Sequence, residues 1–201
     1  LVAAEGAAEP YVAGVVVEAA SGTLRLKMAD GSTTSADPHG DAVVPANPDG
    51  TTAPDHCGLL HLNEPCVLQN SRERYGRDEI YTLVNDILVA VNPFAKLDVY
   101  GSSVMERYAG KALGETGAPP HVYAVGEAAY RHLCANRRAT ALIMSGESGA
   151  GKTETTKHLM GYMAWCSERA SSGGVAAKLA DKIISSSPLL EAFGNCKTVR
   201  N

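Results

Sequence analysis

The chain has 201 residues, of which 45% are hydrophobic and 20% are charged, a balance typical of a globular protein and not of a disordered one. Eighteen basic residues against 22 acidic residues give a net charge of −4, which argues against general nucleic-acid binding because such proteins carry a basic excess. We also expect no transmembrane segment, because the apolar runs are short, and no signal peptide. The odd number of cysteines, 5, favours a reducing, intracellular setting.

The first part of the chain is rich in residues that favour β-strands. Residues 11–17 and 23–28 are short runs of this kind, and the second of them alternates between apolar and polar residues. Ser21-Gly22 and Asp30-Gly31 are turn signals at the ends of these runs. We therefore expect a small β-barrel or meander over residues 8–46.

A composition change then marks a domain boundary. Residues 37–54 are crowded with Pro, Asp, Asn and Gly, which is typical of a loop. We assign residues 47–58 to a linker and residues 59–201 to a second domain. The mixture of helix and strand patterns in this second domain predicts the α/β class.

The second part of the chain carries alternating helix and strand signals. Periodicity, proline positions and turn residues predict these elements, in chain order: a helix over 59–74 with Pro65 in a first turn, a hairpin of strands 80–84 and 87–91, a helix over 121–136, a buried strand over 139–144, a loop over 145–151, a helix over 152–165 with Leu159, Met163 and Cys166 on one face, and a helix over 175–186.

The loop over 145–151 contains the motif that carries chemistry. The string Gly146-Glu147-Ser148-Gly149-Ala150-Gly151-Lys152-Thr153 matches the phosphate-binding P-loop pattern. Glycines can adopt the positive φ angles that let several backbone N–H groups converge on a phosphate, and a following helix adds its N-terminal partial charge. Lys152 is expected to reach the β- and γ-phosphate oxygens, and the Thr153 hydroxyl to bind Mg²⁺.

The P-loop motif and an earlier segment rich in histidine and cysteine each have an alternative interpretation. The motif could be a glycine-rich turn with an incidental Lys-Thr pair, but its predicted strand–loop–helix context favours phosphate binding. His56, Cys57, His61 and Cys66 lie close together in sequence, yet they lack the paired spacing of a zinc site, so we predict no metal there.

No apolar strand ending in Asp follows the P-loop, so the chain shows no second group for nucleotide hydrolysis.

Several ordered segments resemble the myosin motor head. The P-loop string continues into Glu154 as it does in that family, and residues 92–100 (Asn-Pro-Phe-Ala-Lys-Leu-Asp-Val-Tyr) are similar to its adenine-side loop. Residues 119–125 resemble the helix lead-in before the P-loop, and residues 189–201 resemble the approach to the first switch. The resemblance implies a partial P-loop NTPase core preceded by an SH3-like β-barrel.

The resemblance also implies roles for individual residues. Lys152 would be catalytic, and Asn201 would join the P-loop in phosphate binding as the first asparagine of switch I. The adenine side would be formed by Asn92, Pro93, Lys96, Tyr100 and Glu154. The implied cofactor is Mg²⁺ with ATP as substrate, the implied partner is the actin filament, and the implied location is the cytoplasmic actin cytoskeleton.

The resemblance covers only the early part of a motor head. The rest of switch I, switch II and the actin-binding regions would lie beyond Asn201, so we expect a piece of a longer, actin-activated ATPase. Two alternatives stay open: a truncated nucleotide-binding fragment without ATPase or motor activity, and an unrelated P-loop kinase or GTPase. The match over residues 92–100 argues against the second alternative.

Overall fold

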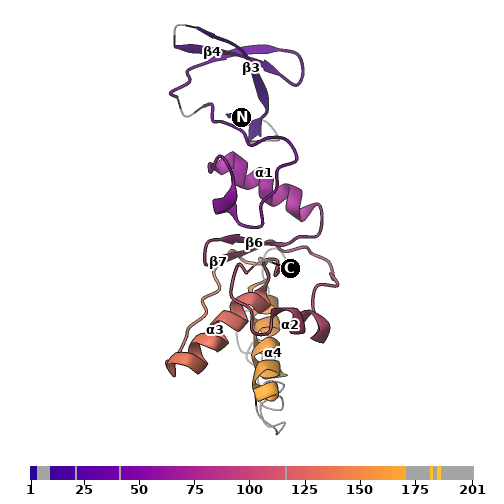
Figure 1. Cartoon of the computed structure of the whole chain (residues 1–201). Coiled ribbons are helices and arrows are strands. Elements are labelled where there is room, and N and C mark those ends of the chain that lie inside the picture. The colour runs from indigo at the N-terminus through magenta and orange to yellow at the C-terminus, as the bar shows by residue number, and fades with distance from the viewer. Residues whose placement is uncertain are drawn as a thin grey trace. The chain divides into compact units, whose positions relative to one another are not determined.

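The structure is a computed structural model that describes residues 1–3, 10–20, 22–40, 42–115, 117–170, 182, 185 and 186. The chain divides into two compact units, Leu1–Gly76 and Arg77–Asn201, and each is described here by itself. Figure 1 shows the elements along the chain. No helix within these described ranges is both long enough and apolar enough to span a bilayer. The predicted helix over 175–186 and the segment 189–201 fall almost entirely outside the described residues.

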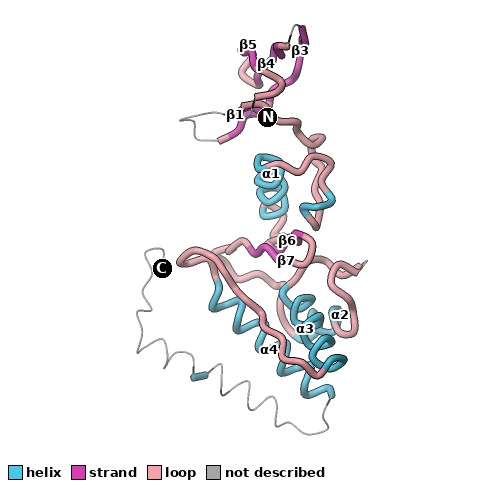
Figure 2. Tube along the Cα trace, turned by 90° about the vertical axis from the view of Figure 1, so that its left-hand side faces the viewer, coloured by secondary structure: helices cyan, strands magenta, loops and turns pink. Residues whose placement is uncertain are grey.

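The first unit begins with small antiparallel sheets (Figure 2). Strand β1 (Val2–Ala3) pairs with β2 (Tyr11–Val12), and a three-stranded sheet has the order β3-β4-β5, formed by β3 (Gly14–Ala20), β4 (Thr23–Met28) and β5 (Thr33–Ala36). The strands predicted over 11–17 and 23–28 are confirmed, apart from a break between β2 and β3. A closed SH3-like barrel stays a prediction.

The first unit ends in a short 3₁₀ turn, η1 (His56–Gly58), and helix α1 (Glu64–Tyr75). The helix was predicted to start at residue 59 but begins at Glu64, because the Asn63 side chain caps it by accepting the Cys66 N–H at 3.1 Å. Pro65 lies in the first turn as expected, where its missing N–H costs nothing. Buried Asn70 holds the preceding loop against α1 through two bonds with the Ala53 backbone, of 2.9 and 3.0 Å.

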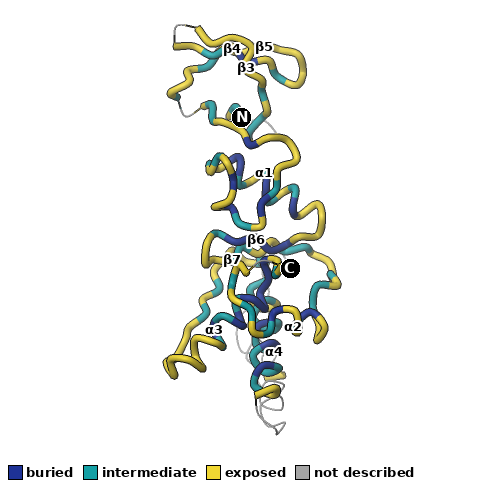
Figure 3. The backbone as a smooth tube through the Cα atoms, viewed as in Figure 1, coloured by how far each residue is buried: buried dark blue, intermediate teal, exposed yellow. Residues whose placement is uncertain are grey.

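The second unit starts with the predicted hairpin. Strand β6 (Tyr81–Val84) pairs antiparallel with β7 (Ile87–Ala90), and the connecting Asn85 has a φ of 53°, as a tight two-residue turn requires. Three helices follow: α2 (Ser102–Tyr108), α3 (Val122–Asn136) and α4 (Lys152–Ala170). Helices α3 and α4 pack against each other, and their buried residues form one core together with β6 and α2 (Figure 3).

One predicted element is wrong and another is longer than predicted. Residues 139–144 form no strand, and Ile143 is 90% exposed. Their apolar composition favours a strand, but a strand also needs a neighbouring strand, and none pairs with them in the described part of the chain. Helix α4 continues past residue 165 to Ala170. On the face predicted from helical spacing, Leu159 and Cys166 are buried and Met163 is half-buried, and the neighbouring Tyr162 is fully buried.

A close approach between α3 and α4 fixes the residue type at Gly126. A Cβ atom on Gly126 would lie 2.8 Å from Tyr162 Cδ1 and 3.0 Å from Leu159 Cδ1, and both side chains are buried. We expect Gly126→Ala to lower the free energy of unfolding by about 1 kcal/mol, since overpacking outweighs the gain in helix propensity. Urea unfolding followed by circular dichroism measures this change.

Gly161 provides the matched control for Gly126, because it also lies inside a helix. No atom lies within 4 Å of the position that its Cβ would occupy. Gly161→Ala is therefore expected to raise the free energy of unfolding by roughly 0.5–1 kcal/mol. Equal effects of the two substitutions would show that the α3–α4 contact is not as close as described.

The core of the second unit is an aromatic cluster around the buried side chain of His121. Its Nδ1 accepts the Tyr123 N–H at 3.1 Å, which caps α3, and its Nε2 donates to the Val99 carbonyl at 3.0 Å. The rings of Tyr81 and Tyr108 lie 4.9 and 5.0 Å from it, measured between centroids. Burial lowers the pKa of His121 to about 4, from an ordinary value of 6.5. The imidazole is therefore neutral at pH 7, as both contacts require.

This lowered pKa predicts a dependence of stability on pH. Between about pH 6.5 and pH 4 the unfolded chain binds the proton and the folded chain does not, so stability falls as the pH falls through this window. The expected loss from His121 is roughly 3 kcal/mol, complete near pH 4. Urea unfolding at a series of pH values measures it.

The control for the pH series keeps the cap and removes the titration. His121→Asn retains a side-chain oxygen for the Tyr123 N–H and cannot take up a proton in this range, so its stability should depend less on pH. His39→Asn changes an exposed histidine and should leave the pH dependence unaltered. A wild-type profile that is flat between pH 6.5 and 4 would contradict the assignment.

Candidate phosphate-binding site

The predicted P-loop is a loop that leads directly into a helix. Residues 145–151 contain no helix or strand, and α4 begins at Lys152, as the motif predicts. Gly149 and Gly151 have φ angles of 80° and 91°, values that residues with a Cβ atom adopt only under strain. The glycines at these two positions are thus required by the path of the backbone.

The Lys152 side chain folds across this loop. Its Nζ donates to the backbone carbonyls of Gly146 and Glu147, each at 2.7 Å, although Lys152 itself starts α4. An ammonium group has three N–H donors, and these contacts use two of them. The positive charge is therefore held beside the loop backbone and the N-terminus of α4, where an anion would find both a cation and free amides.

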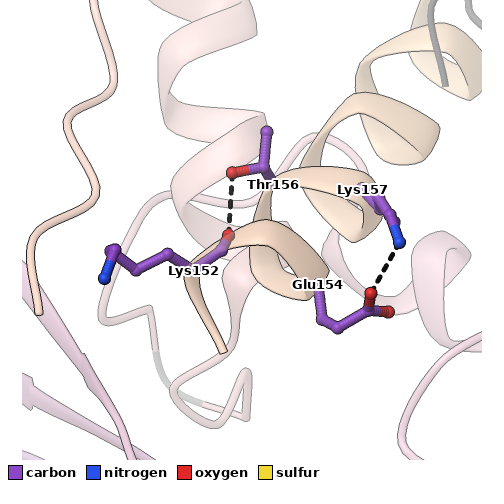
Figure 4. Close-up of polar contacts among 4 residues, drawn as sticks. All are labelled: Lys152, Glu154, Thr156 and Lys157. Atoms are coloured by element: carbon purple, nitrogen blue, oxygen red, sulfur yellow. Dashed lines mark hydrogen bonds and ion pairs between the residues drawn. The ribbon is translucent and has the colours of Figure 1, made fainter. Parts of the chain in front are cut away.

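The first turns of α4 carry further polar side chains (Figure 4). Thr153 is exposed, and Glu154 forms an ion pair with Lys157, with 2.6 Å between Oε1 and Nζ. The Thr156 hydroxyl lies 2.8 Å from the Lys152 carbonyl and 2.8 Å from Met144 Sδ. The Thr156 contacts tie α4 to the segment that enters the P-loop, so both ends of the loop are held.

Asn92 connects the predicted adenine-side loop to the P-loop. Its Nδ2 donates to the Gly149 carbonyl at 2.8 Å, across a separation of 57 residues, and its Oδ1 accepts the Phe94 N–H at 2.9 Å. The first bond joins the two loops and the second fixes the turn after Asn92. Pro93 is half-buried beside Asn92, whereas Lys96 is exposed.

Tyr100 is held by contacts on its ring and on its hydroxyl. Its ring stacks on His158 of α4, with 3.6 Å between centroids and 5° between planes, and its hydroxyl lies 2.8 Å from the Tyr81 hydroxyl. Burial lowers the pKa of His158, so the stacked imidazole favours the neutral form. The structure thus places Asn92 beside the loop before α4 and Tyr100 beside α4 itself, and their role on the adenine side stays a prediction.

Comparison with known proteins decides the family. The family model for the myosin head (motor domain) matches residues 53–201. The chain belongs to the myosin head family. It is 42% identical over 199 residues to myosin-13 of Arabidopsis thaliana, covering 96% of this chain and 13% of that protein. It is 44% identical over 161 residues to unconventional myosin-VI of Mus musculus, covering 79% of this chain and 12% of that protein.

A third relative also matches most of this chain over a small share of its own length. Myosin-5 of Arabidopsis thaliana is 48% identical over 160 residues, which are 77% of this chain and 10% of that protein. The chain therefore spans about a tenth of the length of the curated myosins it matches. Asn201, the predicted switch I residue, lies outside the described residues.

The predicted Mg²⁺ ligand is a single hydroxyl, that of Thr153. Thr153 is exposed in the first turn of α4, directly after Lys152. Within the residues that the structure describes, no group of three or more His, Cys, Asp or Glu side chains could hold a metal ion. Mg²⁺ commonly keeps several waters and binds through one or two protein groups plus substrate phosphates, so one hydroxyl suits it.

Two contacts of the second unit were missed by the sequence analysis, one beside the candidate site and one in the core between α3 and α4. His158 packs on Tyr100 from 58 positions away, and Glu127 of α3 accepts the Tyr162 hydroxyl of α4 at 2.8 Å. Neither belongs to a motif, and both contacts join segments distant in sequence. The only signal in the sequence was helical spacing: His158 and Tyr162 are four residues apart and therefore lie on the same face of α4.

Proposed function

We propose that this chain is the ATP-binding part of an actin-based myosin motor, which couples MgATP hydrolysis to force on actin filaments. The observation that carries the proposal is the Lys152 ammonium held across a glycine-rich loop at the start of α4, in a chain of the myosin head family. The proposal includes a cytoplasmic location on the actin cytoskeleton, an SH3-like barrel over 8–46, a linker over 47–58 and a P-loop core over 59–201.

The proposed mechanism relies on positioning and charge. The loop amides and Lys152 would bind the phosphates and neutralise the charge that develops on them, and Asn201 would join them there. Mg²⁺, held by Thr153 and the phosphates, would neutralise further charge on the same oxygens. Asn92, Pro93, Lys96, Tyr100 and Glu154 would receive the adenine. Attack by water would need further groups, supplied in the whole motor.

A titration of the full chain with three ligands tests the proposal. Isothermal calorimetry with MgATP, MgGTP and magnesium tripolyphosphate separates the phosphate contacts from the contacts to the base. We expect binding of MgATP and of tripolyphosphate, with MgATP tighter because the adenine side adds contacts. A folded chain that binds neither MgATP nor magnesium tripolyphosphate would overturn the proposal.

The alternative is a nucleotide-binding chain without ATPase or motor activity. It predicts the same titrations, but no release of phosphate from MgATP with or without actin filaments. A phosphate-release assay on the 201-residue chain, and on the chain extended to the length of its relatives, distinguishes the two functions. Release that only the extended chain shows, and that actin accelerates, supports the motor.

A further inference from the structure

The end of α3 and the chain that follows it, residues 131–143, form a basic and largely exposed segment. These residues contain three arginines and no aspartate or glutamate. Every residue from 131 to 140 is exposed, and the chain has no helix or strand from 137 onward to the P-loop (Figure 3). This basic segment takes no part in the phosphate-binding contacts described above.

The basic segment contains a single side-chain hydroxyl, that of Thr140. Thr140 follows Arg137, Arg138 and Ala139, so two arginines precede it at the third and second positions. The Thr140 hydroxyl lies 3.1 Å from Nδ1 of His132, and both residues are exposed. That hydrogen bond is open to solvent, so the hydroxyl can exchange it for another partner at little cost.

We propose that Thr140 is a phosphorylation site for a protein kinase that selects arginines N-terminal to its target. Such a kinase recognises its substrate by charge, through acidic groups that pair with the guanidinium groups of Arg137 and Arg138. It also needs an exposed, irregular stretch of chain that can lie extended in its cleft, and residues 137–140 have these properties. The inference does not depend on the proposed ATP binding by the chain itself.

The chemical step uses MgATP as the phosphoryl donor. The Thr140 Oγ1 attacks the γ-phosphorus, forming a new O–P bond while the bond from that phosphorus to the β–γ bridging oxygen breaks. ADP leaves, and the hydroxyl proton passes to the catalytic base of the kinase. The product carries about −1.5 to −2 charges at pH 7 and lies close to Arg137 and Arg138, whose positive charges favour it.

The experiment incubates the full, folded chain with a kinase of this arginine-directed class and MgATP, and maps the modification by mass spectrometry. We expect phosphate on Thr140, none at that position in Thr140→Ala, and none on Thr33, an exposed threonine with no arginine at the two or three positions before it. Phosphate on other residues with Thr140 unmodified would overturn the proposal.

Arginine variants show whether the two guanidinium groups direct the kinase. Arg137→Ala and Arg138→Ala should each lower kcat/KM for Thr140 at least about tenfold, equivalent to about 1.4 kcal/mol for one lost charge-assisted contact. Arg131→Ala, which removes an exposed arginine of α3 outside the recognised positions, should change it less than twofold. Equal effects of all three substitutions would overturn the assignment.

A peptide comparison tests whether the folded chain presents the site. A synthetic peptide of residues 134–145 has the same arginines and no fold. Phosphorylation of the chain at a rate within about tenfold of the peptide supports the proposal, since the only described side-chain contact to displace is the exposed bond to His132. Phosphorylation of the peptide but not of the folded chain would overturn it.

Discussion

Replacing Lys152 with alanine is expected to weaken MgATP binding by about 1.5–3 kcal/mol, or roughly 10- to 150-fold in Kd. The substitution removes the cation that the Gly146 and Glu147 carbonyls hold across the P-loop. A hydrogen bond to a charged group contributes more than a neutral one, so the loss exceeds that of an ordinary contact. Calorimetric titration of the wild-type and variant chains with MgATP measures it.

Lys27→Ala is the matched control for this loss. Lys27 is exposed on β4, and its replacement changes the net charge of the chain by the same amount. It should leave MgATP affinity within about twofold, because Lys27 lies outside the P-loop motif and the effect of an exposed charge is screened by salt. A Lys152→Ala chain that remains folded and binds MgATP as tightly as the wild type would remove Lys152 from the phosphate site.

Replacing Glu127 with alanine is expected to lower the free energy of unfolding by about 3 kcal/mol. Glu127 is 5% exposed, and its carboxylate accepts the Gly110 N–H at 2.9 Å, the Tyr162 hydroxyl at 2.8 Å and the Cys166 thiol at 3.7 Å. Without the carboxylate the buried Tyr162 hydroxyl and Cys166 thiol are left with these bonds unmade, at about 1–3 kcal/mol for each strong donor.

The pKa values of the two side-chain donors support this arrangement. Burial raises the pKa of the Cys166 thiol to about 11, and burial together with the bond to Glu127 raises that of Tyr162 well above its ordinary value. Both groups therefore keep their protons at pH 7 and can donate to the carboxylate. The network joins α3, α4 and the loop after α2.

Urea unfolding of Glu127→Ala, Tyr162→Phe and the double variant separates the bond from the packing. A shared interaction makes the double variant less destabilised than the sum of the two single variants. Glu106→Ala, at an exposed position of α2, should change stability by less than about 0.5 kcal/mol. Additive single effects would show that Glu127 and Tyr162 act separately.

Elements that neighbouring residues determine were predicted more accurately than elements that depend on distant parts of the chain. The hairpin at Asn85, the start of α3 next to His121 and the loop before Lys152 depend on neighbouring residues, and each was predicted close to its observed place. The strand over 139–144 depends on a partner strand, so apolar composition alone predicted it wrongly. The start of α1 failed because the capping role of Asn63 was overlooked.

The candidate site divides in the same way. The P-loop was predicted from its motif, because glycine spacing and the Lys-Thr pair are local properties, and its phosphate binding stays a prediction. Resemblance to a family supplied Asn92 and Tyr100, which the structure brings to Gly149 and to α4. The partners that hold them in place, such as His158, could not be predicted, since no local pattern reports a contact between residues so far apart.

Helix α4 follows the predicted P-loop at one end and packs in the buried core along its length. Lys152 begins the helix, and Tyr162 and Cys166 bond to Glu127 about three to four turns later. A ligand that binds at the first residue of α4 also stabilises the packed residues further along the helix. The size of this stabilisation depends on the ligand concentration relative to the Kd of the ligand. The melting temperature of the second unit therefore reports occupancy of the loop.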